Sequence, residues 1–191
     1  MNPIDFKLYL ISDRKLFPRA MFWRLLEQAL RAGVPAFQLR EKDLCDGDLY
    51  AMAVKARALT RRYGRKLFIN GRFDIAKAVD ADGVHLPEDS LPIGAVREAL
   101  GPRALIGKST HSLIAATKAQ REGADFITFG PVFATASKKQ FGPPVGLDAL
   151  RRVCAKTKIP VFALGGIKPE NAATAFRQGA KGVAMISGLY I

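Results

Sequence analysis

Short apolar runs recur along the chain, and each of them breaks off into polar or glycine-containing residues. The runs are rich in Val, Ile, Leu and Phe and do not alternate cleanly with polar residues, a pattern typical of strands buried on both faces of a parallel sheet. The pattern predicts strands near residues 7–12, 35–40, 66–70, 83–86, 104–108, 126–129, 160–164 and 182–186.

Segments with helical patterning separate these strands, and several of them carry start and stop signals. Ser112 is suited to cap the helix that follows it, and Pro169 stands at a first-turn position. Glycines just after helix ends, where the chain needs a positive φ, are Gly33, Gly64, Gly101, Gly123 and Gly179. The predicted helices span residues 20–32, 46–63, 73–79, 93–100, 113–122, 147–156 and 169–178.

The junction between a helix end and the next apolar strand recurs as a weak internal repeat. Gly33 and Gly123 are separated by the length of four βα units of about 22 residues each, and eight units form a (β/α)8 TIM barrel. A single TIM-barrel domain over residues 1–191 is therefore predicted, with its final helix lacking or truncated. A partner subunit, a rearranged N-terminal segment or a truncated chain would each account for that missing helix. The carboxyl ends of all strands meet at one face, and the active site is expected there.

The charge of the chain narrows the class of ligand. The formal net charge is +13, with 30 Lys and Arg against 17 Asp and Glu, which favours either nucleic acid or phosphorylated metabolites. Because the basic residues are spread along the chain without a nucleic-acid-binding motif, phosphorylated small molecules are the expected partners and nucleic acid is not.

No membrane segment or secretory signal is expected. The longest apolar runs hold about 5–8 residues, against the roughly 20 that a bilayer requires, and no signal-peptide pattern opens the chain. Cys45 and Cys154 have no metal-binding spacing, which fits a reducing cytoplasm.

Polar residues suited to a phosphate follow the second strand. In Gln38-Leu-Arg-Glu-Lys42, alternation places Gln38, Arg40 and Lys42 on one side of an extended chain. An Arg fork and a Lys point charge suit a diphosphate. The alternative is a strand end that frays into solvent, with Arg40 paired to an acidic neighbour.

Two further segments are candidate phosphate sites. The long loop over residues 130–146 is either a phosphate-binding lid or a flexible surface segment, and its candidate ligands are Thr135, Ser137 and Lys138. Loops after strands seven and eight form the usual phosphate site of barrels, and glycines such as Gly165 and Gly166 let backbone N–H groups approach the ligand.

His85 and His111 are the only histidines of the chain. His85 is predicted to be a core histidine with satisfied hydrogen bonds inside a strand. His111 follows a strand end, where a position at the rim of the active site and capping of the next helix are both compatible with the sequence. No Ser/His/Asp arrangement, metal-binding Cys/His cluster or P-loop is visible.

Taken together and in order, these motifs resemble those of the thiamine phosphate synthase family and of its sister branch, the thiazole tautomerases. The resemblance covers nearly the whole chain and is carried by Gln-Leu-Arg-Glu-Lys, Asn-Gly-Arg, Asp-Gly-Val-His-Leu, Ser-Thr-His-Ser, Phe-Gly-Pro-Val-Phe-Ala-Thr, Leu-Gly-Gly-Ile and Met-Ile-Ser. The synthases are transferases of thiamine biosynthesis that couple hydroxymethylpyrimidine diphosphate to thiazole phosphate and release pyrophosphate. In that family the diphosphate leaves first, and the thiazole nitrogen traps the resulting pyrimidine cation.

The resemblance implies a role for each matching residue. The pyrimidine diphosphate would be held by Gln38, Arg40, Lys42 and Asn70. The leaving pyrophosphate would be contacted by Ser109 and Lys138, which form the expected catalytic group together with Arg40. The thiazole phosphate would be held by Thr135, Ser137, Gly165, Gly166, Ile186 and Ser187. Arg72 and His111 complete the expected substrate-binding set.

Two departures concern Mg²⁺, which the resemblance implies as a cofactor. The synthases usually place metal-binding Asp residues at the positions of Gly71 and Ser90 in this chain. Mg²⁺ needs hard oxygen ligands. Either Arg72 substitutes in part for the missing charge, or Asp89 shifts to reach the metal, which makes Asp89 the candidate ligand.

A synthase-type transferase is the expected activity, because the Gln38, Arg40 and Lys42 set suits a diphosphate that a tautomerase does not bind. One alternative is a thiazole phosphate tautomerase-like isomerase, whose branch needs no metal but has its catalytic His where this chain has Pro131, so that His111 would supply the base. Another is a catalytically inactive barrel that binds phosphate ligands. A homodimer is the expected assembly.

Overall fold

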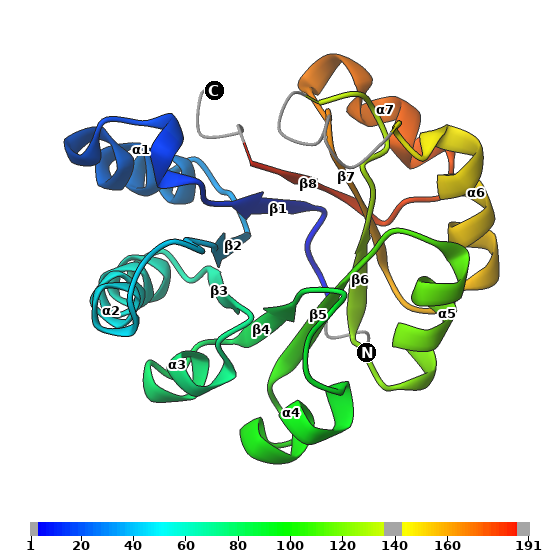
Figure 1. Cartoon of the computed structure of the whole chain (residues 1–191). Coiled ribbons are helices and arrows are strands. Elements are labelled where there is room, and N and C mark those ends of the chain that lie inside the picture. The colour runs from blue at the N-terminus through cyan, green and yellow to red at the C-terminus, as the bar shows by residue number, and fades with distance from the viewer. Residues whose placement is uncertain (1–3, 136–142, 187–191) are drawn as a thin grey trace.

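The computed structural model describes residues 4–135 and 143–186, and within them the chain forms a closed barrel of parallel strands (Figure 1). Each strand pairs with the next one along the chain, and the last strand closes the ring against the first. The predicted fold class is confirmed. The strands are β1 (Leu8–Ile11), β2 (Ala36–Leu39), β3 (Lys66–Asn70), β4 (Gly83–Leu86), β5 (Leu105–Thr110), β6 (Phe126–Phe129), β7 (Val161–Leu164) and β8 (Gly182–Met185).

Helices alternate with the strands and surround the barrel (Figure 1). The predicted lack or truncation of the final helix concerns the chain after β8, where residues 187–191 lie outside the described residues. In the described part of the chain, no helix has the length and hydropathy that a membrane crossing needs. The helices are α1 (Arg19–Arg31), α2 (Asp46–Arg62), α3 (Phe73–Ala78), α4 (Ile93–Leu100), α5 (Leu113–Arg121), α6 (Gly146–Lys156) and α7 (Pro169–Arg177), with a short 3-10 helix η1 (Arg14–Leu16) after β1.

The predicted helix signals act as expected. Ser112 Oγ accepts a hydrogen bond from the Ala115 backbone N–H at 3.1 Å and so caps α5, and Pro169 opens α7. All five glycines predicted after helix ends have positive φ values. Local sequence therefore fixes where the helices begin and end.

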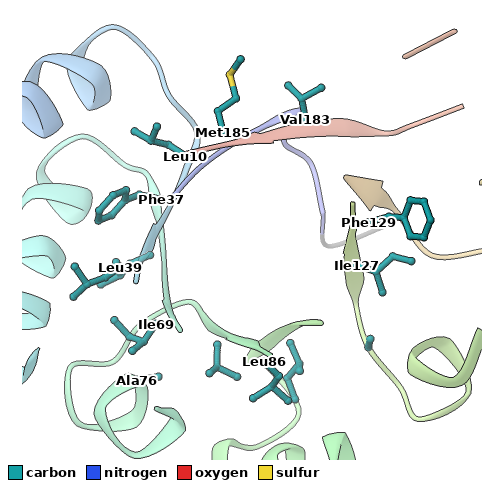
Figure 2. Packing of buried hydrophobic residues seen from close by; sticks show 14 of the residues in the cluster. Leu10, Phe37, Leu39, Ile69, Ala76, Leu86, Ile127, Phe129, Val183 and Met185 are labelled. Atoms are coloured by element: carbon teal, nitrogen blue, oxygen red, sulfur yellow. The ribbon is translucent and has the colours of Figure 1, made fainter. Parts of the chain in front are cut away.

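An apolar layer between the strands and the helices forms the larger part of the core. Alternation along β2 directs Phe37 and Leu39 outward, and Figure 2 shows these side chains and Ile69 pointing from the barrel wall toward the helices. Burial of each side chain of this size stabilises the fold by about 1.5–3 kcal/mol. This layer holds the helices against the barrel.

A second apolar cluster fills the inside of the barrel below the carboxyl ends of the strands. Its aromatic rings, whose contacting pairs have centroids 5.1–6.1 Å apart, come from Phe6, Tyr9, Phe68, Phe126 and Phe162. Small residues on neighbouring strands make room for the rings: a Cβ at Gly107 would lie 2.4 Å from Phe126 Cζ. The interior is therefore filled, and polar groups are left to the face above it.

Candidate active site

A layer of polar side chains lies above the aromatic core, where β2 to β6 end. The register places Asn70 beside His85 and Ser109 beside Thr128. Because Phe68 and Phe126 face inward, Asn70 and Thr128, two residues further along the same strands, face inward too. We call this layer the polar floor, and it consists of Gln38, Asn70, His85, Ser109 and Thr128.

Two cations lie beside the polar floor at the end of β2. Gln38 is buried and its Nε2 donates to Tyr9 Oη at 2.9 Å, which anchors the strand end in the barrel. Arg40 is half-buried and Lys42 is exposed. Repulsion from the positive charge of Arg40 is the main reason that the pKa of Lys42 is lowered, and burial adds to the effect. Neither cation forms an ion pair with an acidic residue in the described part of the chain, so their charges are available to an anion.

The acidic residue between these cations is bound to the neighbouring strand. Glu41 is buried, and its Oε1 accepts from Ser12 Oγ at 2.6 Å and from the Arg14 backbone N–H at 3.1 Å. Burial raises the pKa of Glu41, and these hydrogen bonds oppose that shift. Ser12 Oγ also accepts from the Arg40 backbone N–H at 2.8 Å, so Ser12 and Glu41 hold the backbone that presents Arg40.

His85 lies in the middle of the polar floor. Its Nε2 is 3.1 Å from Ser109 Oγ and 3.3 Å from Thr128 Oγ1. Burial, followed by the positive charges of Arg40 and Lys108, lowers the pKa of His85 to about 3. The predicted burial is confirmed, but the prediction of satisfied hydrogen bonds is wrong for Nδ1, which has no partner in the described structure.

Arg72 lies on the β3–α3 connection, and its guanidinium pairs with two acidic side chains. Its Nε and Nη2 donate to Asp74 at 2.9 and 2.6 Å, and its Nη1 donates to Asp46 at the start of α2. These carboxylates raise the pKa of Arg72. The charge of Arg72 is thus balanced, in contrast to that of Arg40 and Lys42, and substrate contact by Arg72 stays a prediction.

His111 lies at the rim between two loops. Its Nδ1 is hydrogen-bonded to the carbonyl oxygen of Gly130, and its Nε2 is 3.7 Å from Glu88 Oε2. The side chain of His111 is about half exposed, and α5 is capped by Ser112 instead. Of the two predicted positions, the structure places His111 at the rim.

The loops after β6 and β7 pack against each other through glycines. Gly165 and Gly166 have φ values of +93° and +63°, and a Cβ at Gly166 would lie 2.6 Å from the Ala134 carbonyl oxygen. The Phe133 backbone N–H donates to the Gly165 carbonyl at 3.0 Å. Both glycines are therefore needed for this contact.

The remaining predicted phosphate ligands divide into two groups. Thr135 and Ile186 are half-buried at the ends of the described segments. The others lie outside the described residues and stay predictions: Ser137, Lys138 and Ser187.

The positions matched to metal ligands do not fit a Mg²⁺ site. Gly71 has no side chain that could bind a metal ion. Ser90 Oγ accepts a hydrogen bond from the ammonium of Lys108 at 2.8 Å. Asp89 is exposed. The described residues contain no group of three or more His, Cys, Asp or Glu that could hold a metal ion. Since Mg²⁺ is held through carboxylates and a nearby ammonium repels it, no step below is assigned to the metal.

Sequence reasoning missed four residues that build the site: Tyr9, Ser12, Glu41 and Thr128. Thr128 carries a visible signal, because it is the one hydroxyl in the apolar strand Phe126–Phe129 and lies two residues after an inward-facing ring. Alternation also signals Glu41, which must point away from Arg40 and Lys42. Tyr9 and Ser12 become evident only when β1 is paired with β2.

The fold and the site together define a TIM-barrel protein with polar and cationic side chains at the carboxyl face of the strands. Residues 8–189 match the family model described as thiamine monophosphate synthase. The chain belongs to this family.

Relatives and a solved structure agree with that membership. A putative thiamine-phosphate synthase of Geobacter sulfurreducens is 49% identical over 99% of this chain and 89% of its own length. A thiamine-phosphate synthase of Caldanaerobacter subterraneus is 41% identical over 100% of this chain and 89% of its own length. The solved structure of a thiamine phosphate pyrophosphorylase from Pyrococcus furiosus has a TM-score of 0.85 at 39% identity and covers 95% of this chain and 85% of that one.

Proposed function

We propose that this barrel is a thiamine-phosphate synthase, which couples hydroxymethylpyrimidine diphosphate to thiazole phosphate and releases pyrophosphate. The observation that carries the proposal is the pair Arg40 and Lys42 beside the polar floor, without an acidic partner in the described part of the chain. Two adjacent cations repel each other in the free protein, and a diphosphate would remove that repulsion. A tautomerase would have no use for such a pair, because its substrate carries a single phosphate.

The reaction begins with cleavage of the bond between the pyrimidine methylene carbon and the diphosphate oxygen. The electron pair of that bond leaves with the pyrophosphate, so negative charge grows on the bridging oxygen while the carbon becomes cationic. Arg40, Lys42 and the Ser109 hydroxyl stabilise this growing charge more strongly than they stabilise the substrate, and this difference accelerates the step. The thiazole nitrogen then donates its lone pair to the carbon and forms the new C–N bond.

The phosphate of the thiazole substrate is assigned to the loops after β6, β7 and β8. The positive φ of Gly165 and Gly166 exposes backbone near the start of α7, where N–H groups and the helix dipole favour an anion. Thr135, Ser137, Lys138, Ile186 and Ser187 are the proposed companions of this backbone. The opposite half of the site would then hold the diphosphate.

The tautomerase alternative requires His111 to act as a base. Its Nδ1 must carry a hydrogen to donate to the Gly130 carbonyl, and the lone pair of Nε2 in the neutral ring faces the Glu88 carboxylate at 3.7 Å, so the nitrogen that could act as a base is directed at a carboxylate. We therefore expect a His111→Asn variant to retain synthase activity within about threefold. Isomerisation of the thiazole phosphate that depends on His111 would reverse this preference.

A coupling assay tests the proposed function. The protein is mixed with hydroxymethylpyrimidine diphosphate and thiazole phosphate, and thiamine phosphate is measured after oxidation to fluorescent thiochrome. Product far above the enzyme-free control is expected. A folded protein that binds thiazole phosphate but yields no product would overturn the proposal in favour of an inactive binding barrel.

We also propose a cytoplasmic location and a homodimer. Both cysteines are free thiols, as a reducing compartment favours. On the surface of η1, α1 and α2, a cavity of about 500 Å³ lined in part by Phe17, Trp23 and Met52 lies among exposed apolar side chains, which suits contact with a second copy. Light scattering that returns the mass of a monomer would contradict the dimer.

A further inference from the structure

His85 is a buried titratable group to which the reaction above assigns no role. Its ring lies 5.6 Å from those of Tyr9 and Phe126, and its residue surface is 2% exposed. On one edge, Nε2 approaches the hydroxyls of Ser109 and Thr128. On the other edge, Nδ1 has no hydrogen-bond partner in the described structure.

The surroundings of His85 favour a neutral ring. Burial disfavours the imidazolium, and the positive charges of Arg40 and Lys108 disfavour it further, so the pKa falls to about 3. A neutral imidazole carries one N–H donor and one acceptor nitrogen. The question is therefore which of the two nitrogens carries the hydrogen.

The unpartnered nitrogen decides the tautomer. Nδ1 faces the backbone of Gly107 so closely that a Cβ at that position would lie 2.5 Å from it. A buried N–H without an acceptor is rare and costly in folded proteins, whereas an unused acceptor is better tolerated. The hydrogen accordingly belongs on Nε2, where two hydroxyl oxygens are within reach.

We propose that His85 is a positioning residue that is fixed as the Nε2–H tautomer and donates to Ser109 Oγ, so that the Ser109 hydroxyl hydrogen is directed at the diphosphate. This role rests on the proposed synthase function, in which Ser109 contacts the leaving pyrophosphate. In the opposite tautomer Nε2 would accept the hydrogen of Ser109, and the hydroxyl would present only lone pairs to an anion. The tautomer of a buried ring thus sets the polarity of a group at the active site.

The tautomer can be measured directly on the protein without any ligand. The chain has two histidines, so ¹⁵N labelling of histidine gives a spectrum of two rings, and a His111→Asn variant assigns them. For His85 we expect a protonated Nε2 and an unprotonated Nδ1, unchanged between about pH 5 and pH 8. An Nδ1–H tautomer or an imidazolium in that range would overturn the proposal, and this readout does not depend on whether the enzyme is a synthase.

A double-mutant cycle tests the consequence for Ser109. His85→Phe keeps an aromatic ring and removes the donor, and we expect it to lower kcat about 10- to 100-fold with little change in KM. His85→Gln retains an N–H near the position of Nε2 and should recover most of that loss. In a Ser109→Ala background, His85→Phe should cost nothing further, because the group that it orients is gone. Equal losses in both backgrounds would show a merely structural role and overturn the proposal.

Thr110→Val is the matched control for this cycle. It removes a buried hydroxyl from the same strand, but Thr110 donates to the Thr128 carbonyl and is not a member of the polar floor. Its kcat should stay within about twofold. If none of the variants forms product, the same cycle is run on the affinity for inorganic pyrophosphate by calorimetry. A cycle that behaves as expected there would refute only the synthase activity, whereas a His85→Phe effect that persists without Ser109 would refute the positioning role.

Discussion

The two halves of the carboxyl face are built differently. From β2 to β6, inward-pointing side chains make the site: Gln38, Asn70, His85, Ser109 and Thr128 rest on packed strands, and Arg40 lies beside them. From β6 to β8, loop backbone makes it, and Gly165 and Gly166 hold two loops in contact. A site of side chains carries charge and can titrate, whereas a site of backbone offers fixed N–H dipoles. We propose that the first half supplies the charge for a leaving diphosphate and the second anchors a phosphate that does not react.

The largest effect is expected from removing charge in the side-chain half. Arg40→Gln should lower kcat/KM at least about 100-fold, because the guanidinium is proposed to act on charge that grows in the transition state. Steady-state thiochrome assays measure the loss. Arg61→Gln is the control, since Arg61 pairs with Asp80 on the outside of the barrel. Similar losses in the two variants would mean that overall charge, and not the site at β2, attracts the substrate.

The side-chain half should also give the protein a pH-dependent stability, through His85. His85 is neutral in the folded protein down to a pKa of about 3, whereas its ordinary value is 6.5. Below pH 6.5 the unfolded chain binds a proton that the folded chain does not, so stability is present above that pH and is lost as the pH falls toward 3. The free energy of unfolding should decrease by about 1.4 kcal/mol per pH unit within this window, over and above the contribution of other groups.

Denaturant unfolding of the parent chain and of His85→Phe at several pH values isolates this contribution. The variant lacks the imidazole, so it should become more stable relative to the parent chain as the pH falls. A constant difference across the window would contradict the buried neutral state of His85.

The backbone half should respond to a single methyl group. Gly166→Ala places a Cβ 2.6 Å from the Ala134 carbonyl oxygen and forces an L residue to a φ of +63°, whereas Gly64→Ala forces the same φ with nothing within 4 Å. Both variants should lose about 1–2 kcal/mol from the backbone. Gly166→Ala should lose more and also raise the KM for thiazole phosphate, which thermal unfolding and kinetics would measure separately. Identical losses with an unchanged KM would show that the loop contact is unimportant.

The same contrast explains what the sequence could predict. Strand and helix positions follow from local patterns, and the inward alternation of Gln38 and Arg40 was predictable from period two alone. The tie between Ser12 and Glu41 was not, because it joins residues 29 apart that meet only when β1 pairs with β2. The clash that Gly166 avoids likewise depends on a loop more than 30 residues earlier in the chain. Contacts between strands or loops that are far apart in the sequence leave no pattern in the residues around either partner.

The smallest effect is expected where the metal ligands of the resemblance are replaced. Ser90→Asp restores a carboxylate at one of these positions, but the ammonium of Lys108, which now donates to Ser90 Oγ at 2.8 Å, is already there and would pair with it. Burial lowers the pKa of Lys108, and a carboxylate at position 90 would favour its charged form. We therefore expect Ser90→Asp to change kcat/KM less than about threefold and to leave the response of turnover to added Mg²⁺ as it is in the parent chain.

Removing the ammonium sharpens this last prediction. Lys108→Met combined with Ser90→Asp leaves the new carboxylate without a pairing cation, so Mg²⁺ binding measured by calorimetry should appear in the double variant and not in Ser90→Asp alone. Binding of Mg²⁺ by Ser90→Asp with Lys108 intact would mean that the ammonium does not decide the chemistry of this position. The difference between the two variants thus separates two causes, the absence of a carboxylate at position 90 and the presence of a nearby ammonium.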